Sequence, residues 1–158
     1  ASCLVGSEMC IRDSLKSFKV KYEIVPGITS GIGSATYAGI PLTHRKYASS
    51  AVFVTGHEDP EKNEEIVKWK KLAKSVDTIV IMMGLSRIGI ISKQLIEGGM
   101  KKSTPVAVIQ NGTTPKQKMI VGTLTNIATK IKKEKMSPPA NIIIGEVVKL
   151  HKIIGWKK

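Results

Sequence analysis

Residues 22–45, YEIVPGITSGIGSATYAGIPLTHR, decide the fold that we predict for this chain. The stretch opens with a short β-prone segment, residues 22–25, and Pro26-Gly27 then ends the predicted strand with a turn dipeptide. Thr29 or Ser30 can cap the next helix. A helix that begins beside the carboxyl end of a strand points free backbone N–H groups into a crevice, where open α/β sheets bind ligands.

The helix predicted after residue 29 is rich in small residues, namely Gly31, Gly33, Ser34, Ala35 and Ala38. Such a thin helix allows either another backbone or a flat ligand to approach closely, and both alternatives stay open at this point. Thr36 stands where a dinucleotide-binding fingerprint would need its third glycine. The pattern therefore gives little support to a Rossmann site.

Composition favours one well-buried α/β domain. The chain has 158 residues, of which 42% are hydrophobic but only 4% are aromatic. The core must therefore be aliphatic, and the sequence offers little material for stacking nucleic-acid bases. No apolar run reaches the roughly 18 residues that a membrane-spanning helix needs.

The charge balance is strongly basic. Lysine and arginine number 25 against 12 acidic residues, which gives a formal net charge of +13. A positive potential of this size suits an anionic ligand, although lysines on solvated helix faces explain the same count. A basic α/β module that binds RNA or another polyanion is therefore the competing functional class. The scarcity of aromatic residues and of nucleic-acid motifs weighs against it.

Apolar runs and helical patterns alternate along the remaining chain. The patterns predict strands at 49–55, 77–83, 105–110, 116–124 and 141–148, and helices at 61–74, 87–97 and 125–135. The run 77–83, DTIVIMM, is apolar without alternation, as expected for an interior strand covered on both faces. The loop Asn111-Gly112-Thr113-Thr114 comes after the third of these strands, and it is either a plain β-turn or a ligand-binding loop.

Six blocks of the sequence resemble the tetrapyrrole methylase family, in particular its uroporphyrinogen-III C-methyltransferases. They occur in the order of the family and cover roughly residues 22–148. The blocks are VPGITS (25–30), AGIPLTHR (38–45), FVTGHE (53–58), MMGLSRI (82–88), AVIQNGTTPKQK (107–118) and PPANIIIGEVV (138–148).

The resemblance implies an α/β methylase fold with a complete C-terminal domain at 49–158 and the last strand–helix unit of the N-terminal domain at 15–48. Residues 1–14, ASCLVGSEMCIRDS, hold both cysteines and lack the periodic character of the other 144 residues. We expect them to be a non-native leader. The family's GxGPGD strand end and GGDP loop have no counterpart here, so we expect an N-terminally truncated and inactive fragment.

The resemblance also implies S-adenosyl-L-methionine as the methyl donor and S-adenosyl-L-homocysteine as the product. The residues carried over to cofactor binding are Thr29, Ser30, Met83, Gly112 and Ala140. Catalytic acid–base residues are expected only in the part of the family sequence that has no counterpart here, and no metal is expected.

Uroporphyrinogen III, which family enzymes convert to precorrin-2 for sirohaem and cobalamin synthesis, is the implied substrate. Arg45 is the residue that we expect to bind a carboxylate of this tetrapyrrole, because a guanidinium can hold a carboxylate bidentately. His44 is expected to assist. The family further implies a cytoplasmic homodimer that binds neither a membrane nor a specific nucleic acid.

Overall fold

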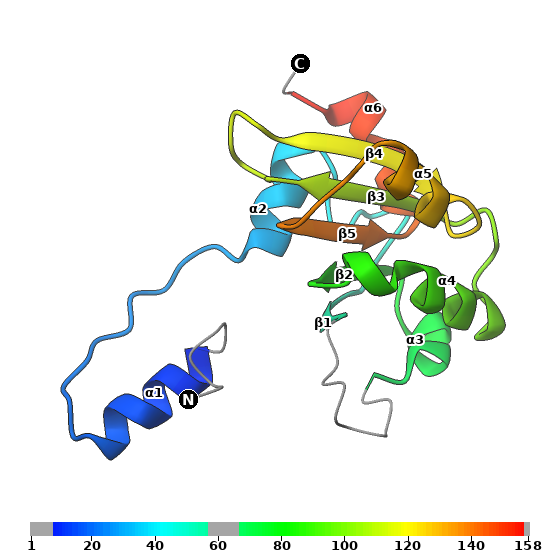
Figure 1. Cartoon of the computed structure of the whole chain (residues 1–158). Coiled ribbons are helices and arrows are strands. Elements are labelled where there is room, and N and C mark those ends of the chain that lie inside the picture. Colours follow the sequence, from blue (N-terminus) through cyan, green and yellow to red (C-terminus); the bar gives the residue numbers. More distant parts are fainter. Residues whose placement is uncertain (1–7, 57–66, 157–158) are drawn as a thin grey trace.

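A five-stranded mixed sheet forms the centre of the computed structural model, which describes residues 8–56 and 67–156 (Figure 1). The strand order is β1-β2-β5-β3-β4. β1 and β2 are parallel, β5 is antiparallel to both β2 and β3, and β4 is antiparallel to β3. The carboxyl ends of β1, β2 and β3 therefore share one sheet edge with the amino ends of β4 and β5. The strands are β1 (Ala51–Thr55), β2 (Thr78–Met82), β3 (Pro105–Gln110), β4 (Lys118–Thr123) and β5 (Ala140–Ile144).

Helices cover both faces of this sheet. α2 (Ser30–Tyr37) and the 3-10 helix η3 (Glu146–Leu150) pack on one face, and α6 (His151–Ile154) comes directly after η3. The other face carries α3 (Trp69–Ser75), α4 (Ile88–Glu97) and α5 (Ile127–Lys133), with the 3-10 turn η2 (Leu85–Arg87) leading into α4. None of the described helices is long and apolar enough to cross a membrane.

The two faces hold cores of different size. On the α3–α5 side, isoleucine and valine side chains of β2, β3 and β5 pack against Trp69, Ile91 and Leu95. On the α2 side, small residues such as Ala35 and Ala107 let the helix lie close to the sheet. Alternate side chains of a strand point to opposite faces, so β3 and β5 contribute to both cores, whereas β2 contributes Ile79 and Ile81 to the core on the α3–α5 side.

Most predicted elements are present, and the α/β class is confirmed. The interior position of β2 is confirmed too, because it lies between β1 and β5 and its residues 78–81 are fully buried. β3 matches its predicted range, and α4 buries Ile88, Ile91 and Leu95 as the helical period indicates. The helix predicted at 61–74 is described only as α3, because residues 57–66 lie outside the described part.

The predicted strand at 22–25 is wrong. Residues 20–29 form no hydrogen-bonded strand, and side chains such as Val25 and Ile28 are 82% exposed. Figure 1 shows this segment leading from α1 (Glu8–Ser17) to α2 as an extended link away from the sheet. A strand needs a neighbour for its backbone N–H and C=O groups, and the described chain places none beside it.

The strand predicted at 141–148 is also shorter than expected. β5 stops at Ile144, and the chain then turns at Gly145, whose φ of +143° favours glycine. A Cβ atom at position 145 would lie 2.5 Å from the Asp77 carbonyl oxygen. The apolar residues Val147 and Val148 still reach the core, but from the 3-10 helix η3.

Candidate functional site

A cleft of about 1170 Å³ opens at the sheet edge where β2 and β3 end and β5 begins. The amino end of α2 forms one side of this cleft, and α4, α5 and the loop before β5 form the other. The lining is mostly apolar, with a few polar side chains, as is typical of small-molecule sites. It consists of Ser30, Ser34, Met82, Met83, Leu85, Ser86, Ile88, Gly89, Ile90, Asn111, Gly112, Thr114, Ala128, Ile131, Lys132, Met136, Pro138, Pro139, Ala140 and Asn141.

Two strand ends at the cleft adopt the left-handed backbone region. Met83 comes after β2 with φ 55°, and Asn111 comes after β3 with φ 49°. Thr113, in the same loop as Asn111, has φ 70°, which is unfavourable for a β-branched residue. Non-glycine residues in this region cost about 1–3 kcal/mol each and concentrate at ligand sites.

The loop after β3 is a hydrogen-bonded turn. The Thr114 N–H and hydroxyl both donate to the Asn111 carbonyl, at 3.2 Å and 2.7 Å. The Thr113 N–H donates to Oε1 of Gln117 at 2.8 Å. The β-turn predicted for this loop is therefore present, and it also contributes Asn111, Gly112 and Thr114 to the cleft.

Asn141 anchors the start of α2 to the sheet. Its side-chain Nδ2 donates to the Ser30 carbonyl at 3.1 Å and to the Ser34 hydroxyl at 2.9 Å. The Ser30 hydroxyl donates to Oδ1 of Asn141 at 3.5 Å. Asn141 is 8% exposed, so these contacts satisfy a nearly buried amide and hold two lining serines in place.

Small residues allow α2 to approach the strand ends. A Cβ atom at Gly31 would lie 2.9 Å from the Phe53 ring and 3.0 Å from Val80. A Cβ atom at Gly112 would lie 2.1 Å from the Ser34 hydroxyl oxygen and 2.7 Å from the Ser34 Cβ. Close helix-on-sheet packing thus explains both glycines, and at Gly112 the missing side chain makes room for α2 rather than for a ligand.

Four of the five predicted cofactor residues line one cleft. These are Ser30, Met83, Gly112 and Ala140. Thr29 does not line it, although its hydroxyl lies 3.8 Å from the sulfur of the lining residue Met82. Thr29 occupies the N-cap position of α2 but makes no side-chain capping hydrogen bond, and none is found from Ser30 either, so the predicted cap is not formed.

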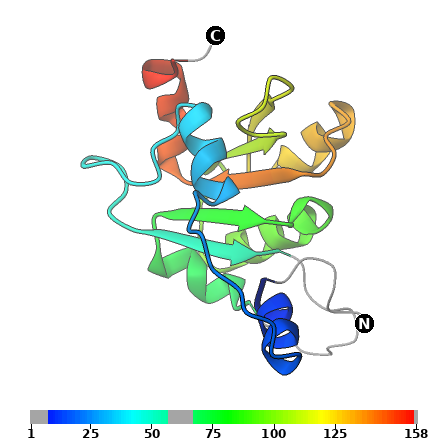
Figure 2. The ribbon, with the colours of Figure 1, turned by 90° about the vertical axis from the view of Figure 1, so that its left-hand side faces the viewer.

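The two predicted substrate residues lie at the opposite sheet edge. His44 and Arg45 belong to the loop that leads into the amino end of β1, with His44 bridged to Ala48. Figure 2 shows this cyan loop projecting on the side away from the arrowhead of β1. A five-residue strand, roughly 16 Å long, separates the two edges. Arg45 is exposed, and neither residue lines the cleft.

The electrostatic character of the cleft is simple. Lys132 is its one charged residue among those described, and no carboxylate lines it. Asp77 and Glu97, the carboxyls with a lowered pKa among the described residues, lie outside the lining. In residues 8–56 and 67–156, no group of three or more histidine, cysteine, aspartate or glutamate side chains could hold a metal ion. The cleft can therefore bind and orient a ligand, but its described lining offers no carboxylate or imidazole for proton transfer.

Several lining residues were not predicted from the sequence. Asn141 belongs to β5, Ser34 to α2 and Met136 to the loop after α5, and only the fold brings them together. Asn141 did carry a signal, since an amide at the start of the apolar run IIIG is unexpected unless it has hydrogen-bond partners. Met136 carried none, because a methionine near a helix end is ordinary in a sequence.

Comparisons with known proteins identify the family of this chain. Residues 2–128 match the family described as Tetrapyrrole (Corrin/Porphyrin) Methylases. The chain is 47% identical over 140 residues to an S-adenosyl-L-methionine-dependent uroporphyrinogen III methyltransferase of Methanosarcina barkeri, covering 89% of this chain and 55% of that protein. It is 46% identical over 144 residues to a siroheme synthase of Nitrosomonas eutropha, covering 91% of this chain and 30% of that protein. The chain thus spans about half the first relative's length and less than a third of the second's.

Solved structures of methyltransferases have a fold similar to that of this chain. A cobalt precorrin-4 methyltransferase matches with a TM-score of 0.80 and 27% identity, over 92% of this chain and 60% of that one. A uroporphyrin-III C-methyltransferase of Thermus thermophilus, complexed with S-adenosyl homocysteine, matches with a TM-score of 0.75 and 30% identity, over 93% and 63%.

Proposed function

The chain belongs to the tetrapyrrole methylase family, and from this premise we propose that its cleft binds the adenosyl group of S-adenosyl-L-methionine in the C-methylation of uroporphyrinogen III. The observation that carries the proposal is the convergence of Ser30, Met83, Gly112 and Ala140 on one cleft. These four residues come from the ends of α2, β2, β3 and β5, far apart in the sequence.

The cleft fits such a ligand in size and chemistry. Its volume of about 1170 Å³ is ample for a nucleoside-sized molecule, and its mostly apolar walls suit a flat purine ring. Met82 and Met83 offer polarisable thioethers that can contact a purine ring in the cleft. The polar side chains of Asn111, Thr114 and Ser30 are available for the hydroxyl and amine groups of the ligand.

The residues of this chain contribute binding and orientation. S-adenosyl-L-methionine supplies an activated methyl group when bound, and transfer to carbon is an in-line displacement that depends on placement of the two reactants. Correct placement can recover about 7–11 kcal/mol of a barrier. The rigid turn after β3 and the anchored start of α2 are well suited to hold one reactant in a fixed pose.

We assign uroporphyrinogen binding to Arg45, with His44 beside it. An exposed guanidinium suits a polycarboxylate substrate. Arg45→Ala should weaken tetrapyrrole binding by a factor of about ten, because it removes a charged hydrogen-bond donor. The affinity for S-adenosyl-L-homocysteine should stay unchanged, because Arg45 lies at the sheet edge opposite the cleft. The homodimer expected for the family offers a way to bring the Arg45 loop of a second copy to the cleft.

The chain's own methionines provide a direct test of cofactor binding. Met82, Met83 and Met136 line the cleft, whereas Met100 and Met119 do not. The chain has six methionines. In a chain labelled with carbon-13 at their methyl groups, S-adenosyl-L-homocysteine should shift the three cleft resonances and leave those of Met100 and Met119 in place. Absence of any shift at millimolar ligand, or shifts at Met100 and Met119 as large as those of the cleft methionines, would refute the proposal.

We expect binding to be weak and the 158-residue chain to transfer no methyl group. The cleft is open to solvent on one side, and its described lining contains neither a carboxylate nor an imidazole. A methyl-transfer assay with uroporphyrinogen III checks this expectation. Turnover well above the background rate would show that acid–base residues lie within this chain.

A further inference from the structure

One wall of the cleft is a loop whose first half is anchored to α5, because the Met136 N–H donates to the Ile131 carbonyl at 3.0 Å and the Met136 side chain is buried in the larger core. Residues 134–139 connect α5 to β5, and Met136, Pro138 and Pro139 line the cleft. The two prolines have no N–H group, so they cannot donate a hydrogen bond to the neighbouring strands. The position of the second half of the loop, residues 137–139, therefore depends on the residues that contact it from the neighbouring strand.

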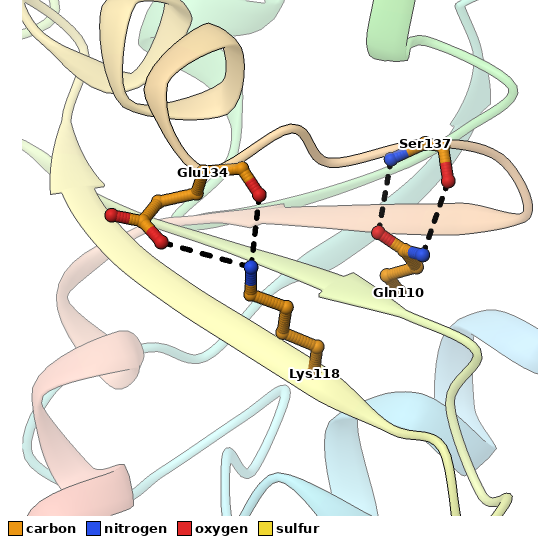
Figure 3. A network of polar contacts seen from close by, with 4 residues as sticks. All are labelled: Gln110, Lys118, Glu134 and Ser137. Atoms are coloured by element: carbon orange, nitrogen blue, oxygen red, sulfur yellow. Dashed lines mark hydrogen bonds and ion pairs between the residues drawn. The ribbon is translucent and has the colours of Figure 1, made fainter.

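Gln110 holds the middle of this loop through a reciprocal pair of hydrogen bonds. The Ser137 N–H donates to Oε1 of Gln110 at 2.9 Å, and Nε2 of Gln110 donates to the Ser137 hydroxyl at 3.1 Å (Figure 3). Next to this pair, the Asn111 N–H donates to the Pro139 carbonyl at 3.0 Å. Gln110 itself does not line the cleft.

A second tether holds the start of the same loop. Nζ of Lys118 donates to the Glu134 carbonyl at 2.8 Å and lies 3.6 Å from a Glu134 carboxylate oxygen. Lys118 is the partner of Gln110 in the β3–β4 ladder, so two neighbouring positions on the sheet hold both ends of residues 134–137. Both side chains in the Lys118–Glu134 ion pair are nearly half exposed, so this pair adds little to stability.

These contacts lie apart from the buried cores. Gln110, Ser137 and Lys118 belong to neither hydrophobic cluster. Loss of the Gln110 contacts should therefore loosen the wall of the cleft more than the fold as a whole.

We propose that Gln110 is a positioning residue, which fixes the Pro138–Ala140 wall against which the adenosyl ligand rests. The inference depends on the proposed function for its ligand, but its structural part can be measured without one. Gln110→Met preserves the shape of the side chain and removes both hydrogen bonds. Gln110→Glu retains two oxygens that can accept from the Ser137 N–H and hydroxyl, and so it is the rescue variant.

The ligand-free test is amide hydrogen exchange at Asn111, whose N–H reports whether Pro139 stays in place. In Gln110→Met, exchange at Asn111 should accelerate about tenfold, as expected for loss of two modest hydrogen bonds. Gln110→Glu should restore it to within about twofold. Thr125→Val serves as the matched control, because it removes one exposed hydrogen bond, to the Lys102 carbonyl, outside the cleft.

The ligand test is the affinity for S-adenosyl-L-homocysteine, read from the Met83 and Met136 methyl resonances. Gln110→Met should raise the dissociation constant about five- to tenfold, with a thermal midpoint close to that of Thr125→Val. Unchanged exchange at Asn111, or a fall in thermal midpoint large enough to account for the loss of affinity, overturns the inference. A wild-type chain that binds no ligand refutes the proposed function alone, and exchange at Asn111 then decides the role of Gln110.

Discussion

Asp77 shows how one carboxylate can join two strands at their amino ends. One carboxylate oxygen accepts hydrogen bonds from the N–H and hydroxyl groups of both Ser49 and Ser50, at 2.8–3.1 Å. These donors, the Ser49 N–H first, lower the pKa of Asp77 from its ordinary value of 3.8. A group whose pKa is lower in the folded state stabilises the fold above its unfolded-state pKa and loses that effect as the pH falls.

Asp77→Asn should therefore reduce the free energy of unfolding at pH 7 by about 1 kcal/mol, a low value for a charged acceptor because the carboxylate faces solvent. The difference between variant and wild type should shrink below about pH 4, where the wild-type carboxylate takes up a proton. Urea unfolding between pH 3 and 7 measures this. A difference that stays constant over the whole range would contradict the assigned role.

Met83 illustrates a cost in stability at the cleft. Its φ of 55° is unfavourable for methionine, and its side chain is 62% exposed, so little apolar burial compensates. Met83→Gly should raise the free energy of unfolding by about 0.5–1 kcal/mol while weakening the binding of S-adenosyl-L-homocysteine. Urea unfolding and ligand titration test the two effects separately. A lower free energy of unfolding in this variant would show that packing of the Met83 side chain stabilises the fold by more than its backbone conformation costs.

At the scale of elements, the contact between α2 and the turn after β3 positions both sides of the cleft. Gly112→Ala should lower the free energy of unfolding by about 1–3 kcal/mol, because its Cβ would overlap Ser34. Ser34→Gly removes the two nearest atoms of that overlap, although it also removes a partner of Asn141. In a double-mutant cycle measured by urea unfolding, the combined loss should be smaller than the sum of the single losses by at least about 0.5 kcal/mol. If the two losses of free energy simply add, residues 112 and 34 do not interact across the contact between α2 and the turn.

For the whole molecule, the formal charge of +13 predicts weak and nonspecific binding to RNA. The logarithm of the binding constant should fall by about 0.7 per phosphate contact for each tenfold increase in salt. Fluorescence titrations of an unstructured RNA at several salt concentrations measure the slope. A sequence-selective complex that survives physiological salt would favour the basic binding module over the methylase site.

Local pattern determined much of this fold. The bounds of β3, the buried face of α4 and the turn at Asn111–Thr114 all depend on the order of residues within a few positions. Hydrophobic period and turn chemistry act over such short distances, so they can be interpreted without the tertiary structure. The four predicted cofactor residues that line the cleft lie in short motifs at the ends of such elements, and the resemblance of those motifs to the family is the basis of that prediction.

The tertiary structure alone decided three other features. Residues 22–25 have strand propensity, but within residues 8–56 and 67–156 no strand lies beside them to pair with. In the sequence, Gly112 is compatible with either a β-turn or a ligand-binding loop. Only the packing of α2 shows that its missing side chain makes room for Ser34. The contacts of Asn141 with Ser30 and Ser34 join residues more than 100 positions apart. Such contacts depend on how whole elements pack, and local residue order does not encode the distance between two elements.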